Sequence, residues 1–348
     1  MLSKKIIILS NGYRGGATEF LIQHINFLLK KKNQITLIDD NPQKNFKSIK
    51  GKIKIFKLDV NRPTFFSRNK INQILNNNEK NNILFITNFA FLIKYFFILN
   101  KFKKRNIIVL TLHSGILKLN IKNYLAGFLF SFVYFIPTII FFGSNSSKIW
   151  WQSTYPWMKL RNNKIIYNGI ALNKNKIKKL NKNNINISFI GRLEKENNPN
   201  LFIKIANNFQ NKNYKVKFNI FGDGTLFSEL KNKNNSKKII FHGWRKKSYI
   251  YKKSDLVIIT SDVNNFPYVA LESMSYGIPI ISCSKGDIKY MIKNGKNGFI
   301  KYTKSSKEIE NLIYKVINDY NKFSKNALIN IKNFDENKSM NKFWKYLL

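Results

Sequence analysis

Three side chains that could act on a phosphorylated substrate lie next to apolar runs of the sequence. His113 directly follows such a run, Arg192 follows one after Gly191, and Glu272 lies in a helical segment that begins after Pro267. A histidine can hold or move a proton near neutral pH, and an arginine offers a fork of donors that suits a diphosphate. A carboxylate one turn inside a helix can accept both hydroxyls of a ribose. These residues indicate a nucleotide site, with a structural hydrogen bond as the alternative role of His113.

A glycine-bearing turn supplies a second candidate for phosphate binding. The turn 11–16 contains Gly12, Gly15 and Gly16 and joins an apolar run to a helical segment. Backbone N–H groups at such a turn, together with the helix dipole, favour a phosphate. A turn between a strand and a helix can equally need glycine for its geometry alone. Gly15 and Gly16 are therefore candidates, and both interpretations stay open.

The segment 261–277 is the strongest single pattern in the sequence. A strand ends before it, a loop turns at Pro267, and a helix follows that carries Glu272 and stops at Gly277. The first N–H groups of a helix have no partner within the helix, so they can bind an anion. The residues around this helix start are candidates for contact with a nucleotide: Phe266, Pro267, Tyr268 and Val269.

Short apolar runs alternate with helical periodicity from one end of the chain to the other. This alternation predicts an α/β protein with parallel sheets and crossover helices. In the first half, strands are expected at 5–10, 34–38, 52–58, 83–87, 107–112, 138–142 and 164–167. In the second half, they are expected at 185–190, 216–221, 238–241, 256–260, 278–282 and 298–302. Ligands of such sheets bind beyond the carboxyl ends of the strands, where the candidate residues lie.

The 348 residues are too many for one small core and predict two domains. Residues 172–184 are rich in Asn and Lys and are typical of a solvated linker. We expect one doubly wound, Rossmann-like domain over 1–171 and a second over 185–330, facing each other across a cleft. Residues 331–348 are expected to form a C-terminal helix that packs back on the first domain.

The chain is strongly basic, with 61 Lys and Arg against 18 Asp and Glu and a formal net charge of +43. Such a charge attracts nucleic acid, anionic lipid or phosphorylated substrates. Lys, Asn, Ile and Phe are abundant in apolar and polar segments alike, which indicates that compositional bias supplies much of the charge. Zinc-ligand spacing and RNA-binding aromatic motifs are missing from the sequence, so nucleic acid is not expected as a partner.

The single cysteine and the longest apolar stretch bear on the compartment. Cys283 cannot form an intramolecular disulfide and is expected to be a small core residue, which fits a reducing cytoplasm. The stretch 124–142 is near the minimum length for a membrane span, but it contains Pro137 and ends in β-branched and aromatic residues. We interpret it as a buried helix followed by a buried strand at 138–142.

The motifs taken together resemble the retaining family 4 glycosyltransferases of GT-B fold. The resemblance covers nearly the whole chain, and it rests on motifs that follow one another in the family's order: Gly15-Gly16, His113, Asn168-Gly169, Gly191-Arg192-Leu193, Gly222-Asp223-Gly224, Phe266-Pro267-Tyr268-Val269-Ala270-Leu271-Glu272 and Gly295-Lys296-Asn297-Gly298-Phe299. It implies an enzyme, of hexosyltransferase type, that takes a sugar from a nucleotide-diphosphate donor held by the second domain. The acceptor would be held by the first domain, and neither a metal nor a cofactor is expected.

The same resemblance assigns roles to particular residues. Arg192 matches the arginine that neutralises the leaving diphosphate, Glu272 the carboxylate that binds ribose, and His113 the histidine beside the donor sugar. Two positions depart from the family. Asn197 stands where a lysine is expected, with Lys195 two positions away, and Asn264 stands where the first glutamate of a pair is expected. Each replacement removes a charge, so catalysis is weaker or the donor sugar differs.

The resemblance also implies an acceptor that is a glycan or a lipid-linked glycan of surface polysaccharide or lipopolysaccharide synthesis. Aromatic residues at 91–97 followed by Lys101, Lys103, Lys104 and Arg105 are typical of a peripheral contact with anionic membrane. A core helix with a solvated end explains the pattern equally well. We expect a cytoplasmic protein, with the inner face of the plasma membrane as a possible place of action. The alternative function is a catalytically degenerate GT-B subunit or a basic binding protein.

Overall fold

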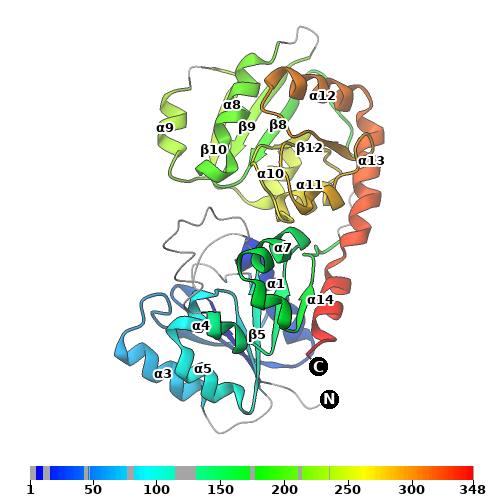
Figure 1. Ribbon diagram of the computed structural model, residues 1–348. Coiled ribbons are helices and arrows are strands. Elements are labelled where there is room, and N and C mark those ends of the chain that lie inside the picture. The colour runs from blue at the N-terminus through cyan, green and yellow to red at the C-terminus, as the bar shows by residue number, and fades with distance from the viewer. Residues whose placement is uncertain are drawn as a thin grey trace. The chain divides into compact units, whose positions relative to one another are not determined.

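The computed structural model describes residues 5–10, 16–42, 46, 48–76, 82–113, 131–172, 177–210, 214–234 and 236–347. The chain divides into two compact units (Figure 1). Unit 1 contains Met1–Asn168 together with Ser339–Leu348, and unit 2 contains Gly169–Lys338. Each unit has its own parallel sheet and its own buried core.

Unit 1 is built on a seven-stranded parallel sheet in the order β3-β2-β1-β4-β5-β6-β7. Its strands are β1 (Lys5–Leu9), β2 (Gln34–Asp39), β3 (Lys54–Lys57), β4 (Ile83–Ile86), β5 (Ile107–Leu112), β6 (Ile139–Phe142) and β7 (Asn163–Ile165). Its helices are α1 (Gly16–Lys30), α3 (Phe65–Leu75), α4 (Ala90–Lys94), α5 (Phe96–Lys103) and α7 (Asn145–Thr154), with 3₁₀ turns η1 (Ser131–Phe135) and η2 (Pro156–Leu160). The reversal of strand order falls between β1 and β4, which is a typical ligand position of doubly wound sheets.

Unit 2 has a six-stranded parallel sheet in the order β10-β9-β8-β11-β12-β13. Its strands are β8 (Ile185–Ile190), β9 (Val216–Phe221), β10 (Ile239–Gly243), β11 (Leu256–Ile259), β12 (Ile280–Ser282) and β13 (Gly298–Ile300). Its helices are α8 (Pro199–Asn208), α9 (Phe227–Asn232), α10 (Lys247–Lys253), α11 (Tyr268–Ser275), α12 (Ser306–Asn318) and α13 (Tyr320–Asn330), with 3₁₀ turns η3 (Lys195–Asn197), η4 (Asp287–Tyr290) and η5 (Ile331–Phe334).

The local sequence explains why these elements form and where the helices begin. The central strands β4 and β11 are buried along their whole length, as apolar runs covered by helices on both faces of a parallel sheet must be. Thr64 caps α3 and Ser144 caps α7, each by accepting the N–H three residues further on. Asn198, at φ 48°, caps α8 in the same way before Pro199.

The end of the chain belongs to unit 1. Helix α14 spans Glu336–Trp344, and its Phe343 lies against α1 and β6. The ring of Phe343 is 4.4 Å from His24 and 4.0 Å from Phe141, centroid to centroid. Phe343 and Trp344 are almost completely buried. The last residues therefore complete the aromatic core beside α1.

The predicted fold class, two doubly wound parallel sheets, is confirmed, and every predicted strand is present. In the stretch 124–142, the predicted strand at 138–142 is present as β6. Of the predicted buried helix before it, Ser131–Phe135 form a 3₁₀ turn, and residues 124–130 lie outside the described residues. Among the helices that the structure describes, none is long and apolar enough to span a bilayer. Residues 177–184 belong to unit 2, where Lys178 forms an ion pair with Asp255 at 3.1 Å.

Candidate functional site

The loops after β8 and β9 lie against each other at the carboxyl edge of the unit 2 sheet. Gly222 has a φ of +136°, and a Cβ there would lie 1.9 Å from the carbonyl oxygen of Gly191. The Leu193 N–H donates to the Asp223 carbonyl at 2.9 Å. This close backbone approach requires glycine at position 222 and fixes the loop that carries Arg192.

Arg192 lies on this loop with an exposed side chain. Its guanidinium forms an ion pair with Glu196 at 2.9 Å, and both side chains are more than half exposed. Such a pair contributes little free energy, so the guanidinium can turn to a bound anion at small cost. Lys195 is the first residue of the 3₁₀ turn η3, which also contains Glu196, and its side chain is exposed as well.

Asn197 has a local role that its sequence position did not reveal. Its Nδ2 donates to the Arg192 carbonyl at 2.8 Å, which closes the loop around η3. Its own carbonyl accepts the Thr260 hydroxyl at 2.9 Å, at the end of β11. The residue that stands in place of the expected lysine therefore holds the Arg192 loop to the neighbouring strand.

Asn264 belongs to a network of hydroxyl groups beyond β11 and β12. Its Nδ2 donates to the Ser261 hydroxyl and, at 3.1 Å, to the Ser284 hydroxyl. The Ser284 hydroxyl donates its own hydrogen to the Ser261 carbonyl, so it can only accept from Asn264. This geometry fixes the orientation of the amide and uses both of its N–H bonds. The side chain can then offer a ligand only its Oδ1 as an acceptor.

The segment 261–277 contains the predicted loop at Pro267 and the predicted helix, α11, which ends before Gly277. Phe266 has a φ of +141° and is buried, with its ring edge-on to Phe334 at 5.5 Å between centroids. Pro267 precedes α11, Tyr268 is buried at the helix start, and Val269 is partly buried. A non-glycine residue in this strained region is rare, so the packing of Phe266 determines the path of the loop.

Glu272 points from α11 toward α10. Its Oε1 lies 2.7 Å from the Lys247 ammonium, and its Oε2 accepts the Tyr251 hydroxyl at 2.5 Å. The Glu272 side chain is 13% exposed. The sequence predicts a ribose contact, because this carboxylate lies one turn inside a helix and matches the ribose-binding glutamate of the family that the chain resembles. The structure supplies two partners from another helix, and the ribose contact stays a prediction.

His113 lies at the end of β5 in unit 1. Its ring packs edge-on to Phe20 at 4.2 Å, and Gly143 lies so close that a Cβ there would be 2.7 Å from His113 Nδ1. Its Nε2 is buried and has no hydrogen-bond partner among the described residues. Burial lowers the pKa of His113 to about 4. The imidazole is therefore neutral at physiological pH, and its contact with a sugar stays a prediction.

The glycine turn and the aromatic segment 91–97 are the other candidates in unit 1. Gly16 is the first residue of α1, and Gly15 lies outside the described residues. Phe91 and Tyr95 are core residues, as the packing interpretation of 91–97 required, whereas Phe97 is exposed.

Cys283 is buried, and burial raises the pKa of its thiol to about 12, which fits the core residue expected. Within the described ranges no cluster of three or more His, Cys, Asp or Glu could hold a metal.

The sequence did not single out the four residues that contact Glu272 and Asn264. Lys247 and Tyr251 contact Glu272, and Ser261 and Ser284 contact Asn264. Lys247 and Tyr251 are four residues apart in α10, so a helical spacing was visible in the sequence. The sequence did not show, however, that this face of α10 points toward Glu272. The site therefore contains supporting residues that only the arrangement of α10, α11 and the strand ends brings together.

Residues 172–332, which are nearly all of unit 2, match the sequence model of the family described as glycosyl transferases group 1. A segment of 170 residues is 30% identical to the UDP-Gal:alpha-D-GlcNAc-diphosphoundecaprenol alpha-1,3-galactosyltransferase of Escherichia coli and covers 46% of the chain and 44% of that relative. A segment of 151 residues is 32% identical to the GalNAc-alpha-(1->4)-GalNAc-alpha-(1->3)-diNAcBac-PP-undecaprenol alpha-1,4-N-acetyl-D-galactosaminyltransferase of Campylobacter jejuni and covers 42% of each chain. The chain thus spans less than half the length of these curated relatives.

Solved structures resemble the chain over its whole length. The crystal structure of Anabaena HepE in complex with UDP-glucose superposes with a TM-score of 0.78 and 19% identity, over 99% of both chains. The sucrose-phosphate synthase of Thermosynechococcus elongatus gives a TM-score of 0.76 at 12% identity, over 99% of this chain and 98% of that one. At these identities the similarity shows the fold, which is the GT-B fold with two Rossmann-like units.

Proposed function

We propose that the protein is a retaining, metal-independent glycosyltransferase of family 4 type. In this proposal it moves a sugar from a nucleotide-diphosphate sugar to a lipid-linked glycan, or to another glycan acceptor, in surface polysaccharide synthesis. The observation that carries the proposal is the carboxyl edge of unit 2. There Arg192 and Asn264 lie on loops that follow the neighbouring strands β8 and β11, and Glu272 lies in the next helix, α11, of a domain that matches glycosyl transferases group 1.

Each of these residues has a role that its chemistry supports. Arg192, with Lys195 beside it, stabilises the negative charge on the leaving diphosphate. Asn264 accepts a hydroxyl of the donor sugar with its Oδ1, because its N–H bonds are used by Ser261 and Ser284. Glu272 accepts ribose hydroxyls. Neutral His113 in unit 1 lies beside the donor sugar, as the family resemblance implies.

The first experiment identifies the donor. Purified protein is screened with UDP, GDP, ADP, CDP and TDP by thermal shift, and the dissociation constant of the tightest binder is then measured by calorimetry. Replacing Glu272 by Ala should weaken that binding by about 1.5 to 3 kcal/mol, the usual value of a hydrogen bond to a charged group. A wild-type protein that binds none of the five nucleotides contradicts the proposed function.

The second experiment tests transfer and stereochemistry. The corresponding nucleotide sugars are incubated with a synthetic diphospholipid-linked sugar, and the anomeric configuration of the product is determined by NMR. Retention of the donor configuration supports the proposal. Inversion contradicts the retaining mechanism and leaves the transferase assignment intact.

A catalytically degenerate subunit is the second candidate, favoured by the neutral residues at positions 197 and 264. In a degenerate subunit, wild type would bind a nucleotide but transfer no sugar, and the double substitution Asn197→Lys with Asn264→Glu would gain turnover. Robust wild-type turnover contradicts this candidate, because it would mean that neither missing charge is required.

We also propose that unit 1 contacts anionic membrane from the cytoplasmic side. Phe65, Phe66 and Phe97, here called the aromatic rim, are 82%, 71% and 86% exposed. They lie in the first turns of α3 and α5, which pack side by side (Figure 1). The Tyr95 hydroxyl donates to the Val60 carbonyl at 3.0 Å, so the chain just before α5 touches the chain just before α3.

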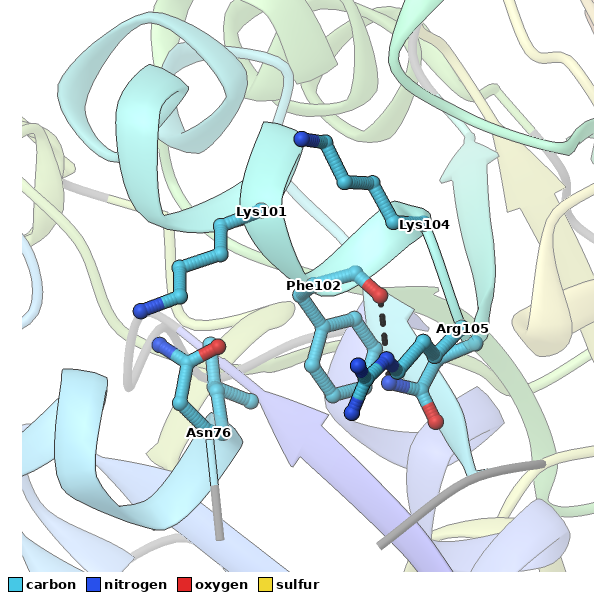
Figure 2. A pocket seen from close by; sticks show the side chains of 7 residues that line it. Asn76, Lys101, Phe102, Lys104 and Arg105 are labelled. Carbon is cyan, nitrogen blue, oxygen red and sulfur yellow. Dashed lines mark hydrogen bonds between the residues drawn. The ribbon is translucent and has the colours of Figure 1, made fainter. Parts of the chain in front are cut away.

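Basic residues continue the exposed surface of α5. Lys101, Lys104 and Arg105 line a hollow of about 320 Å³ at the other end of this helix, and Figure 2 shows the two lysines extending from the helix. Apolar side chains beside basic ones suit the interface of an anionic bilayer, with about 1 kcal/mol per basic residue near the surface.

Vesicle sedimentation tests this contact. Wild type should sediment with phosphatidylglycerol vesicles, less so as salt rises, and replacing all three rim residues by Ser should abolish sedimentation. Leu160→Ser is the matched control, because Leu160 is 78% exposed elsewhere on unit 1. Equal sedimentation with neutral vesicles, or an unchanged rim variant, contradicts the proposal.

A further inference from the structure

Helix α10 places two side chains against the carboxylate of Glu272. Lys247 and Tyr251 are four residues apart, so they share one face of α10. The Lys247 ammonium lies 2.7 Å from Oε1, and the Tyr251 hydroxyl donates to Oε2 at 2.5 Å. Each carboxylate oxygen therefore has one partner, and both partners come from the same helix.

The two partners differ in how firmly they are held. Tyr251 is 1% exposed, and its ring stacks on Tyr276 at 5.2 Å between centroids. A hydroxyl on a packed ring can move little, and its hydrogen bond to a carboxylate is charge-assisted. Lys247 is 53% exposed, so its ion pair is weakened by water and salt. Tyr251 is thus the principal partner and Lys247 the lesser one.

The carboxylate keeps capacity for a ligand after both contacts are made. Two carboxylate oxygens offer about four acceptor positions, and Lys247 and Tyr251 occupy one on each oxygen. We propose that Tyr251, supported by Lys247, is a positioning residue that orients Glu272 to accept the ribose hydroxyls of a nucleoside diphosphate. This inference rests on the proposed function and names residues that act through Glu272 without touching the ligand.

A purely structural role predicts a different result. If the contacts only hold α10 to α11, losing the Tyr251 hydroxyl weakens the binding of every nucleotide alike, or of none. If they orient Glu272, the loss falls on ligands that carry ribose hydroxyls, because an oriented acceptor lowers the cost of binding those groups alone. Removing the hydroxyls from the ligand therefore separates the two roles.

The experiment uses the nucleoside diphosphate that binds wild type most tightly among UDP, GDP, ADP and CDP, together with its 2′,3′-dideoxy form. Tyr251→Phe should raise the dissociation constant of the ribonucleotide about fivefold and that of the dideoxy form less than twofold. Tyr276→Phe is the matched control, since it keeps the ring stack and leaves the Tyr251 hydroxyl in place. The free energy of unfolding in urea is measured for both variants.

Two further variants sharpen the result. Lys247→Gln should raise the ribonucleotide dissociation constant about twofold at low salt and leave it unchanged in 0.5 M NaCl, whereas Lys252→Gln on the same helix should have no effect. In a Glu272→Ala background, Tyr251→Phe should cost no further affinity, because the residue through which it acts is gone.

Equal losses for the two ligands, an unchanged ribonucleotide affinity in Tyr251→Phe, or full additivity with Glu272→Ala would each overturn the inference. Wild type that binds nucleotides but does not distinguish ribose from dideoxyribose removes the ribose role of Glu272 and this inference together. Wild type that binds none of these four nucleotides and also does not bind TDP removes the proposed function itself, so the failures are distinguishable.

Discussion

The carboxyl edges of the two parallel sheets are built in different ways. In unit 2, Asn197, Asn264 and Glu272 each have hydrogen-bond partners from a neighbouring loop or helix. In unit 1, His113 packs against Phe20, and its Nε2 has no hydrogen-bond partner among the described residues. His24 beside it is buried among aromatic rings, and both of its ring nitrogens lack partners there as well.

This difference determines what each edge can do. Hydrogen bonds in unit 2 hold polar side chains in fixed orientations, which suits a charged ligand that needs prearranged groups. Aromatic packing in unit 1 holds its two histidines neutral, because burial disfavours the imidazolium form. Polar contacts therefore orient the candidate side chains of unit 2, and apolar packing stabilises unit 1. Acid should weaken that packing, because it favours the charged form of the two buried histidines.

The largest expected effect tests how tightly the loops of unit 2 are packed. Gly222→Ala should lower the free energy of unfolding by about 3 kcal/mol, since its Cβ would meet a backbone carbonyl. Gly243→Ala is the matched control: its φ is +64°, but no atom lies within 4 Å of the added Cβ, so it should cost only about 1 kcal/mol. Urea unfolding measures both. Equal costs would mean that backbone conformation, not close approach, requires Gly222.

The second prediction concerns acid and unit 1. The pKa of His24 lies well below its ordinary value and that of His113 falls to about 4, both mainly by burial. Unfolded histidines titrate near 6.5, so the unfolded state takes up protons first as the pH falls below that value. Stability is therefore complete above about pH 6.5 and is lost below it, by up to about 1.4 kcal/mol per histidine between pH 7.5 and 5.5.

Replacing His24 by Leu separates the contribution of one histidine. Leu fits an apolar site and does not titrate, so this variant should lose about half of the acid sensitivity of unit 1. Urea unfolding followed by tryptophan fluorescence measures it, because Trp344 lies 5.8 Å from His24 between ring centroids. An unchanged difference between the two pH values would show that His24 is not responsible.

The third prediction tests the orientation of Asn264. Asn264→Asp places an oxygen where Nδ2 now donates to Ser284, whose own hydrogen is already used. We expect about tenfold weaker binding of the nucleotide sugar, with unchanged binding of the nucleotide alone. Asp262→Asn, a nearby exposed change of charge, should alter neither. Equal weakening of both ligands would place Asn264 outside the sugar contact.

The smallest expected effect concerns position 197, where Asn stands in place of the lysine that the family resemblance implies. Asn197→Lys should tighten nucleoside diphosphate binding two- to fivefold at low salt, because a second cation attracts the diphosphate, and the gain should disappear at high salt. The nucleoside of the same base, which lacks phosphate, should bind equally to wild type and variant. Asn200→Lys, at an exposed position of α8, controls for charge in general. A weaker-binding Asn197→Lys would show that the hydrogen bond to Arg192 matters more than the added charge.

The apolar pattern of the amino-acid sequence is sufficient to predict the strands and their order along the chain. Strands of parallel sheets are buried on both faces, so they read as continuous apolar runs, and the predicted runs 185–190 and 216–221 coincide with β8 and β9. The sequence also placed Arg192 and Glu272 beyond strand ends, since turns and helix starts leave local signals. The apolar residues of 91–97 marked a helical region but could not show that Phe91 is core and Phe97 exposed.

The sequence does not show which partners those residues have in the folded chain. Tyr251 precedes Glu272 by 21 residues, Ser284 follows Asn264 by 20, and Phe343 packs on His24 from the other end of the chain. These contacts depend on which strands are neighbours and on which face each helix turns inward, for example on β11 lying between β8 and β12. Periodicity along the chain reports how each segment is buried. Hydrogen bonds and ion pairs act over a few ångströms in space, so their partners follow from the folded arrangement alone.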